Sequence, residues 1–299
     1  MAKKNKKKSR AEDPREAGPQ PPFQQKAQTY PGSDEQMTPP ADHGQDRTPT
    51  AAQLAGKVAL ITGGDSGIGR AVALAYAQHG ANVLFSYLDE KEDARETIRL
   101  IEENGQRGIG IAGDIQDEKH CRKLVERAVK EFGQLDILVN NAAYQMAIDD
   151  LQDYTAEQID RTYRTNVFAM FYLCKAAVPR MKAGASIINT TSIQAYDPSP
   201  NLLDYASTKS AIIGFTKALA KMVIEQGIRV NAVAPGPVWT PLIPATMPAE
   251  KTKNFGDNTL FDRPAQPAEL APVFVLLASD AAAYITAEVY GVTGGRTPY

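Results

Sequence analysis

From residue 58 onward, apolar runs of strand length alternate with segments that have helical periodicity. Most of the runs are apolar at every position, which is typical of strands buried on both faces of a parallel sheet. The runs span residues 58–62, 83–87, 108–112, 137–140, 186–190, 230–234 and 289–293. The helical segments between them include residues 68–79, 92–104, 119–132, 157–181, 206–226 and 268–279.

This alternation predicts one α/β domain over residues 54–299, a doubly wound (Rossmann-type) fold with helices on both faces of the sheet. Right-handed crossovers would give the first six strands the order 3-2-1-4-5-6. The last run would add a seventh parallel strand at the edge. No internal repeat is visible, and no stretch remains for a second domain.

The first 53 residues differ in composition from the rest of the chain. They hold eight of the 20 prolines and few aliphatic side chains, so they cannot bury enough apolar surface to fold alone. We expect residues 1–20 to be disordered and 21–53 to form an extended arm, with Phe23, Tyr30 and Met37 as anchors on a folded surface. The lysine run near the N-terminus fits a solvated charged tail better than a nucleic-acid or membrane contact.

Composition excludes several classes of protein. The net charge of -2 gives no electrostatic signature of nucleic-acid binding. Cys121 and Cys174 lie in helical segments, so we expect no disulfide framework and a cytoplasmic location. The three histidines are scattered, which argues against a catalytic metal. No apolar stretch reaches the roughly 20 residues of a membrane span, and the charged N-terminus lacks the apolar core of a secretory signal.

A glycine-rich turn, Thr62-Gly-Gly-Asp-Ser-Gly-Ile-Gly69, joins the first strand to the first helix. Glycines allow close approach of the backbone to a pyrophosphate, and the helix N-terminus supplies N–H donors and a positive dipole. Such loops also serve as plain turns, but the strand before it and the helix after it favour dinucleotide binding.

Tyr205 and Lys209 are four residues apart at the start of a helix, so both side chains lie on one face. A neighbouring ammonium lowers the pKa of a phenol, which suits a general acid for carbonyl reduction. Alone, this pair would more often be a solvent-facing helix pair. Ser192, where the fifth strand ends, can direct its hydroxyl at the same carbonyl oxygen.

Three further features follow the later strands. Asn140-Asn-Ala-Ala143 ends the fourth strand, Asn166 lies within a long helix, and the Pro235-Gly236 turn follows the sixth strand. Asn166 has poor helix propensity, and if it faces the sheet edge it could hold a water in a proton relay. Residues 241–263 have the apolar character of a substrate lid.

Together these motifs resemble the successive motifs of the short-chain dehydrogenase/reductase family, over residues 54–299. Thr62-Gly-x-x-x-Gly67-Ile-Gly69, Asn140-Asn141-Ala142, Asn166, Ser192, Tyr205-x-x-x-Lys209 and Pro235-Gly236 occur in the family's order. A finer likeness is to the glucose/ribitol dehydrogenase-like or aldehyde-reductase-like subgroup. Ala143 departs from the glycine that is usual in the family.

The resemblance implies a catalytic set and a cofactor site. The catalytic residues would be Asn166, Ser192, Tyr205 and Lys209. The cofactor-binding residues would be Gly63, Ser66, Gly67, Ile68, Gly69, Tyr87, Asp114, Ile115, Asn141, Ala142, Tyr205, Lys209, Pro235, Gly236, Val238 and Thr240. The substrate would contact Ser192, Gln194, Tyr205 and Trp239.

We therefore expect reversible hydride transfer between a nicotinamide cofactor and an aldehyde, ketone, sugar or polyol, in a homotetramer. NADP(H) is favoured over NAD(H), because Tyr87 stands where NAD enzymes place a ribose-binding carboxylate that would repel a 2′-phosphate. Ser66, Ser86, Arg70 and Lys91 are candidates for a phosphate, and Asp89 is the candidate ribose acceptor. The alternative is a non-catalytic dinucleotide-binding protein, against which the intact Ser192, Tyr205 and Lys209 argue.

Overall fold

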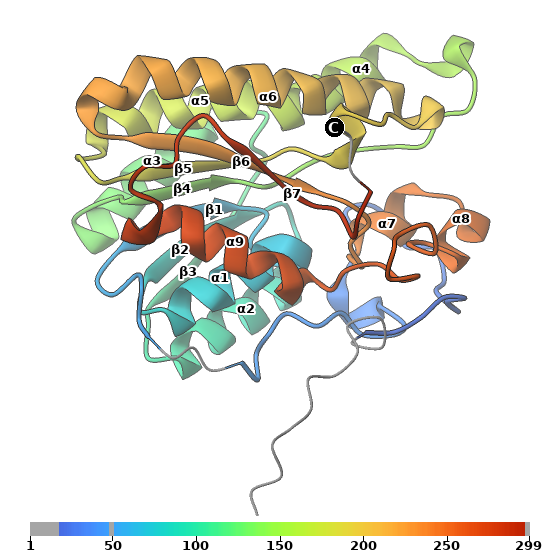
Figure 1. Ribbon diagram of the computed structural model, residues 1–299, viewed down its shortest axis with the longest axis horizontal. Coiled ribbons are helices and arrows are strands. Elements are labelled where there is room, and N and C mark those ends of the chain that lie inside the picture. The colour runs from blue at the N-terminus through green and yellow to red at the C-terminus, as the bar shows by residue number, and fades with distance from the viewer. Residues whose placement is uncertain (1–17, 48–50, 297–299) are drawn as a thin grey trace, which may run out of the picture.

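The computed structural model describes residues 18–47 and 51–296 (Figure 1). The expected order of strands is confirmed: one sheet of seven parallel strands runs β3-β2-β1-β4-β5-β6-β7. The strands are β1 (Val58–Thr62), β2 (Asn82–Tyr87), β3 (Gly108–Ala112), β4 (Ile137–Asn140), β5 (Ser186–Thr190), β6 (Arg229–Pro235) and β7 (Val289–Val292).

Helices cover both faces of this sheet (Figure 1). On one face lie α1 (Gly67–Gln78), α2 (Lys91–Glu103) and α9 (Pro267–Ala278); on the other lie α3 (Glu118–Phe132), α5 (Ala169–Ala177) and α6 (Leu203–Val223). The short helices α4 (Ala156–Tyr163), α7 (Leu242–Thr246) and α8 (Ala249–Lys253) complete the set. No described helix is long and apolar enough to cross a membrane.

β1 shows why the runs are apolar throughout. Ala59 and Ile61 pack into the core beneath α1 and α9, whereas Leu60 packs into the core beneath α3 and α5. Successive side chains of a strand point to opposite faces, so a strand covered on both sides needs apolar residues at every position.

The helix expected over residues 157–181 is interrupted. Between α4 and α5 the backbone widens into a π-helical segment, η4 (Arg164–Phe168). Such bulges occur mostly as single turns within α-helices and are frequent at functional sites. The widened turn coincides with Asn166, whose side chain bonds to the backbone of Tyr144 rather than facing solvent.

The N-terminal arm, residues 18–47, runs beside α7 and α8 (blue in Figure 1). The N–H of Phe23 donates to the carbonyl of Lys253 at 2.7 Å, and that of Gln28 donates to the carbonyl of Pro244 at 2.9 Å. Phe23 and Met37 are buried. The expected disorder of residues 1–20, and with it the lysine run, falls mostly outside the described residues.

Candidate functional site

A cavity of about 610 Å³ opens where β1 to β6 end, the edge at which parallel α/β sheets bind ligands. Most of the residues assigned from sequence line it together: Gly63, Ser66, Gly67, Ile68, Tyr87, Asp114, Ile115, Asn141, Ala142, Ser192, Gln194, Tyr205, Lys209, Pro235, Gly236, Val238 and Thr240. Three assigned residues do not line this cavity: Gly69, Asn166 and Trp239.

The β1–α1 turn depends on its glycines, as Gly67 and Gly69 show. Gly67 has a φ of 50°, in the left-handed region that side chains with a Cβ rarely adopt. A Cβ at Gly69 would collide with the carbonyl oxygen of Gly63, so Gly69 lets α1 begin directly against the turn instead of lining the cavity. The turn and the N-terminus of α1 fit a pyrophosphate, and the volume suits a dinucleotide.

Asn141 ties the ends of β1 and β4 together. Its Nδ2 donates to the carbonyl oxygens of Thr62 and Gly63, both at 3.2 Å. In return, the Thr62 hydroxyl accepts from the N–H groups of Asn141 at 3.0 Å and Ala142 at 3.1 Å. These bonds fix the floor of the cavity.

Tyr205 and Lys209 lie together on the first turns of α6, with the Lys209 Nζ 5.1 Å from the centre of the Tyr205 ring. Nζ also donates to the carbonyl oxygen of Thr190, at the end of β5, at 2.9 Å. The Ser192 hydroxyl accepts from the N–H of Gln194 at 3.1 Å and hydrogen-bonds to Tyr205. Serine, tyrosine and lysine therefore converge on one side of the cavity.

The protonation of this group differs from the sequence-based expectation that Lys209 lowers the pKa of Tyr205. Burial raises the pKa of Tyr205 to about 12, and the Ser192 hydrogen bond opposes this only partly. Burial also lowers the pKa of Lys209 to about 7. Desolvation penalises both charged forms, so the phenol is held neutral, as a proton donor must be.

The side chain of Asn166 does not have the position expected for binding a relay water. Its Oδ1 accepts from the N–H of Tyr144 at 2.7 Å, and its Nδ2 donates to the Tyr144 carbonyl at 2.9 Å and to Thr208 at 3.0 Å. The side chain therefore fixes the loop after β4 to α6, and any water would have to bind the backbone of this π-helical turn.

The expected substrate contact of Trp239 is wrong in this structure. Its side chain is fully buried. The centroids of its ring and that of Phe23 are 4.2 Å apart, and its Nε1 donates to the carbonyl of Pro39 at 2.8 Å. An apolar side chain beside a lid can face either the ligand or the protein interior, and the arm covers this one.

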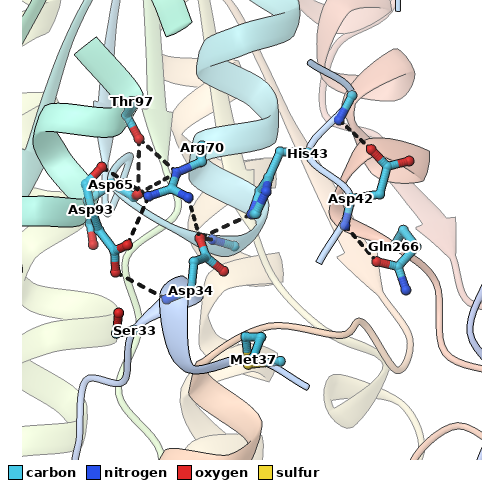
Figure 2. Close-up of polar contacts among 12 residues, drawn as sticks. Ser33, Asp34, Met37, Asp42, His43, Asp65, Arg70, Asp93, Thr97 and Gln266 are labelled. Carbon is cyan, nitrogen blue, oxygen red and sulfur yellow. Dashed lines mark hydrogen bonds and ion pairs between the residues drawn. The ribbon is translucent and has the colours of Figure 1, made fainter. Parts of the chain in front are cut away.

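Arg70 is not available to a 2′-phosphate. Its guanidinium is buried, pairs with Asp34 at 3.0 Å and Asp93 at 3.1 Å, and donates to the Thr97 hydroxyl at 2.9 Å (Figure 2). Ser66 and Ser86 do line the cavity.

The carboxylate after β2 that lines the cavity is Glu90, whereas Asp89 is exposed and lies outside the lining. Burial and a hydrogen bond with Asp89 raise the pKa of Glu90. A carboxyl with a raised pKa repels a phosphate less than an ordinary one would.

The arm supplies cavity residues that sequence reasoning did not assign to the site. Tyr30 and Pro31 line the cavity, and the Tyr30 hydroxyl donates to the carbonyl of Ala143 at 3.3 Å. The Tyr30 ring also meets that of Tyr144 edge-on, with centroids 4.9 Å apart. The aromatic anchors of the arm were a usable signal, but nothing in the sequence ties Tyr30 to the loop after β4.

Sequence comparison finds relatives over most of the chain. A family model described as enoyl-(acyl carrier protein) reductase matches residues 63–297. The uncharacterized oxidoreductase YhdF of Bacillus subtilis is 51% identical over 89% of this chain and 92% of its own length. Glucose and ribitol dehydrogenase of Daucus carota and NADPH-dependent aldehyde reductase 1 of Arabidopsis thaliana are each 43% identical over 91% of this chain, and over 95% and 96% of their own lengths.

Comparison with solved structures also finds relatives over most of the chain. A short-chain dehydrogenase from Burkholderia cenocepacia in complex with NADP has a TM-score of 0.76 and 33% identity over 81% of this chain and 98% of its own. A 3-ketoacyl-(acyl-carrier-protein) reductase from Brucella melitensis complexed with NADH has a TM-score of 0.73 and 33% identity over 81% and 99%.

Proposed function

Because this chain belongs to the short-chain dehydrogenase/reductase family, we propose that it is an NADP(H)-dependent enzyme that interconverts a polar carbonyl compound and its alcohol. NAD(P)-dependent oxidoreductase activity on alcohol or carbonyl groups follows from the family and its relatives. The observation that carries the proposed site is the convergence of Ser192, Tyr205 and Lys209 beside the glycine-rich turn.

We assign each of these residues a role. A bound reduced nicotinamide supplies the hydride. The Ser192 and Tyr205 hydroxyls donate hydrogen bonds to the substrate oxygen, where negative charge develops as the hydride arrives. Tyr205 then gives its proton to that oxygen. Lys209, fixed by the Thr190 carbonyl, would bind the nicotinamide ribose, and in its protonated form it would stabilise the phenolate that remains.

The preference for NADP(H) rests on the region after β2. Tyr87 ends this strand, Ser66 and Ser86 offer hydroxyl donors, and Glu90, the carboxyl after β2 that lines the cavity, has a raised pKa. NADPH in the name of the Arabidopsis relative and NADP in the Burkholderia complex agree with this preference. The Brucella structure contains NADH, so the family fold alone does not decide between the two.

Polar side chains in the wall of the cavity favour a hydroxylated substrate. Gln145, Gln194, Ser199, Asn254 and Asn258 all line it. A sugar, polyol or hydroxyaldehyde offers hydroxyl groups to such donors and acceptors. Asp204, next to Tyr205 in the chain, is buried and accepts hydrogen bonds from Thr162 and Gln158 instead.

The experiment is a panel of aldehydes, ketones, sugars and polyols, assayed by the absorbance of the reduced cofactor. With one working substrate, we expect kcat/KM to be higher with NADPH than with NADH. A preference for NAD(H) of about tenfold, or about 1.4 kcal/mol, would overturn the assignment. It would also make Glu90, rather than Asp89, the first ribose acceptor to test.

We further propose a cytoplasmic homotetramer. Phe168, Phe171 and Met222 expose apolar side chains around α5 and α6, and such surfaces mark subunit contacts. Cys121 and Cys174 are buried and unpaired, as is typical of a reducing compartment. Light scattering that gave a monomer, or fractionation away from the cytoplasm, would contradict these two assignments.

A further inference from the structure

The arm inserts a carboxylate beneath the glycine-rich turn. The short 3-10 helix η2 (Asp34–Gln36) brings Asp34 under the N-terminus of α1 (Figure 2). Gly32, just before it, packs so tightly that a Cβ there would lie 2.7 Å from the Pro241 carbonyl oxygen. The arm is therefore held closely where it crosses the cavity edge.

Asp34 is held by a buried ion cluster. Its Oδ2 pairs with Arg70 at 3.0 Å and with His43 at 3.1 Å, and its own N–H donates to Asp93 at 3.1 Å. Although burial raises the pKa of Asp34, His43, Arg70 and the Gly67 N–H together hold it below its ordinary value. Asp34 is therefore a fixed anion, and its Oδ1 is buried with no hydrogen-bond partner among the described residues.

The same oxygen that pairs with Arg70 also accepts from the N–H of Gly67 at 3.2 Å. Gly67 is the left-handed residue of the turn, and a Cβ on it would lie 3.1 Å from Thr240, in the loop after β6. The first turn of a helix leaves its N–H groups without intrahelical acceptors. Asp34 accepts a hydrogen bond from the N–H of Gly67, which leaves the N–H of Ile68, a residue of the cavity wall, for an anionic ligand.

We propose that Asp34 is a positioning residue for the cofactor: through Gly67, the arm holds the glycine-rich turn in its pyrophosphate-binding shape. The neighbouring arm residues Tyr30 and Pro31 form part of the cavity wall. The arm is thus a working part of the nucleotide site rather than a covering segment. This inference rests on the proposed cofactor site.

The test measures binding of NADPH directly, by the change in its fluorescence, together with thermal unfolding of each variant. Asp34→Ala removes the acceptor of Gly67, whereas Asp34→Asn keeps an oxygen that can accept the same hydrogen bond. Asp93→Asn disturbs the same ion cluster without touching Gly67. Asp42→Asn alters a half-exposed carboxylate elsewhere on the arm, which pairs with Arg47 at 3.4 Å.

We expect Asp34→Ala to raise the Kd for NADPH about tenfold, which is about 1.4 kcal/mol. Asp34→Asn should be intermediate, and Asp93→Asn and Asp42→Asn should stay within threefold of wild type. At saturating NADPH, kcat of Asp34→Ala should be close to wild type, because the residue touches no reacting atom. If Asp34→Ala does not fold, the comparison of Asp34→Asn with Asp93→Asn decides.

Two results would overturn the inference. One is a Kd for Asp34→Ala, or for Asp34→Asn where it must stand in, within twofold of wild type. The other is an equal weakening by Asp93→Asn, which would show that the loss follows from general loosening of the cluster. A wild-type protein that binds neither NADPH nor NADH would instead overturn the proposed function itself, and the two failures are thereby distinguished.

Discussion

Among single residues, Lys209 stands out because its Nζ is buried against a backbone carbonyl at the site. The pKa of its ammonium falls to about 7. Between that pH and about 10.5, the unfolded chain carries a proton that the folded chain lacks. Wild-type stability therefore rises with pH across this window.

Lys209→Met tests whether the lowered pKa of Lys209 makes stability depend on pH. Near pH 7 the variant should be more stable than wild type by on the order of 1–3 kcal/mol, despite losing the hydrogen bond to Thr190, because it removes the desolvation penalty. The advantage should shrink toward pH 10. Urea unfolding at several pH values measures it, with the exposed Lys217→Met as the control. If the variant is less stable than wild type near pH 7, or if their difference in stability does not change with pH, the lowered pKa of Lys209 is refuted.

Some residues of the site could be placed from the sequence and others could not. That Tyr205, Lys209 and Ser192 lie together was predictable, because fixed spacing in a helix and position at a strand end carry information about geometry. Trp239 was misassigned because its apolar character is equally compatible with a lid and with the interior. Asp34 gave no signal, because a single carboxylate in a polar arm has no periodicity and its partners lie in other elements.

Among the elements, the arm has the least regular structure and makes the most unexpected contacts. Its anchors were predictable: Phe23 and Met37 are buried, and Phe23 packs on Trp239. The course of the arm between these anchors was not predictable, because an extended segment has no hydrophobic periodicity that indicates where it runs. The break at η4 was likewise hidden, because the residues on both sides of it fit one continuous helix.

Phe23→Ala tests whether the arm contributes to the fold. It should lower the free energy of unfolding by on the order of 2 kcal/mol, because it leaves a cavity over the Trp239 ring. Gln24→Ala, at an exposed neighbouring position, should have little effect. Denaturant unfolding compares the two. Equal stability of both variants would mean that the arm is not docked in solution.

For the whole molecule, strand order followed from the doubly wound fold class, in which crossovers between parallel strands have one hand and six strands take the order 3-2-1-4-5-6. The sheet then brings loops that are far apart in sequence to one edge, and for this reason most of the residues assigned to the cofactor site line one cavity. The protonation of the site was not predictable, because desolvation depends on what surrounds a group in three dimensions. Burial therefore reverses the expected shift of Tyr205.

The central claim, that Tyr205 donates the proton in carbonyl reduction, is tested most directly by Tyr205→Phe. Turnover should fall by about 10² to 10⁴, the range for loss of a positioned proton donor. The Kd for NADPH should change less than threefold. Tyr163→Phe, which removes a hydroxyl bonded to Ser207 outside the cavity, is the matched control and should be near wild type. Turnover of Tyr205→Phe close to that of wild type would contradict the account.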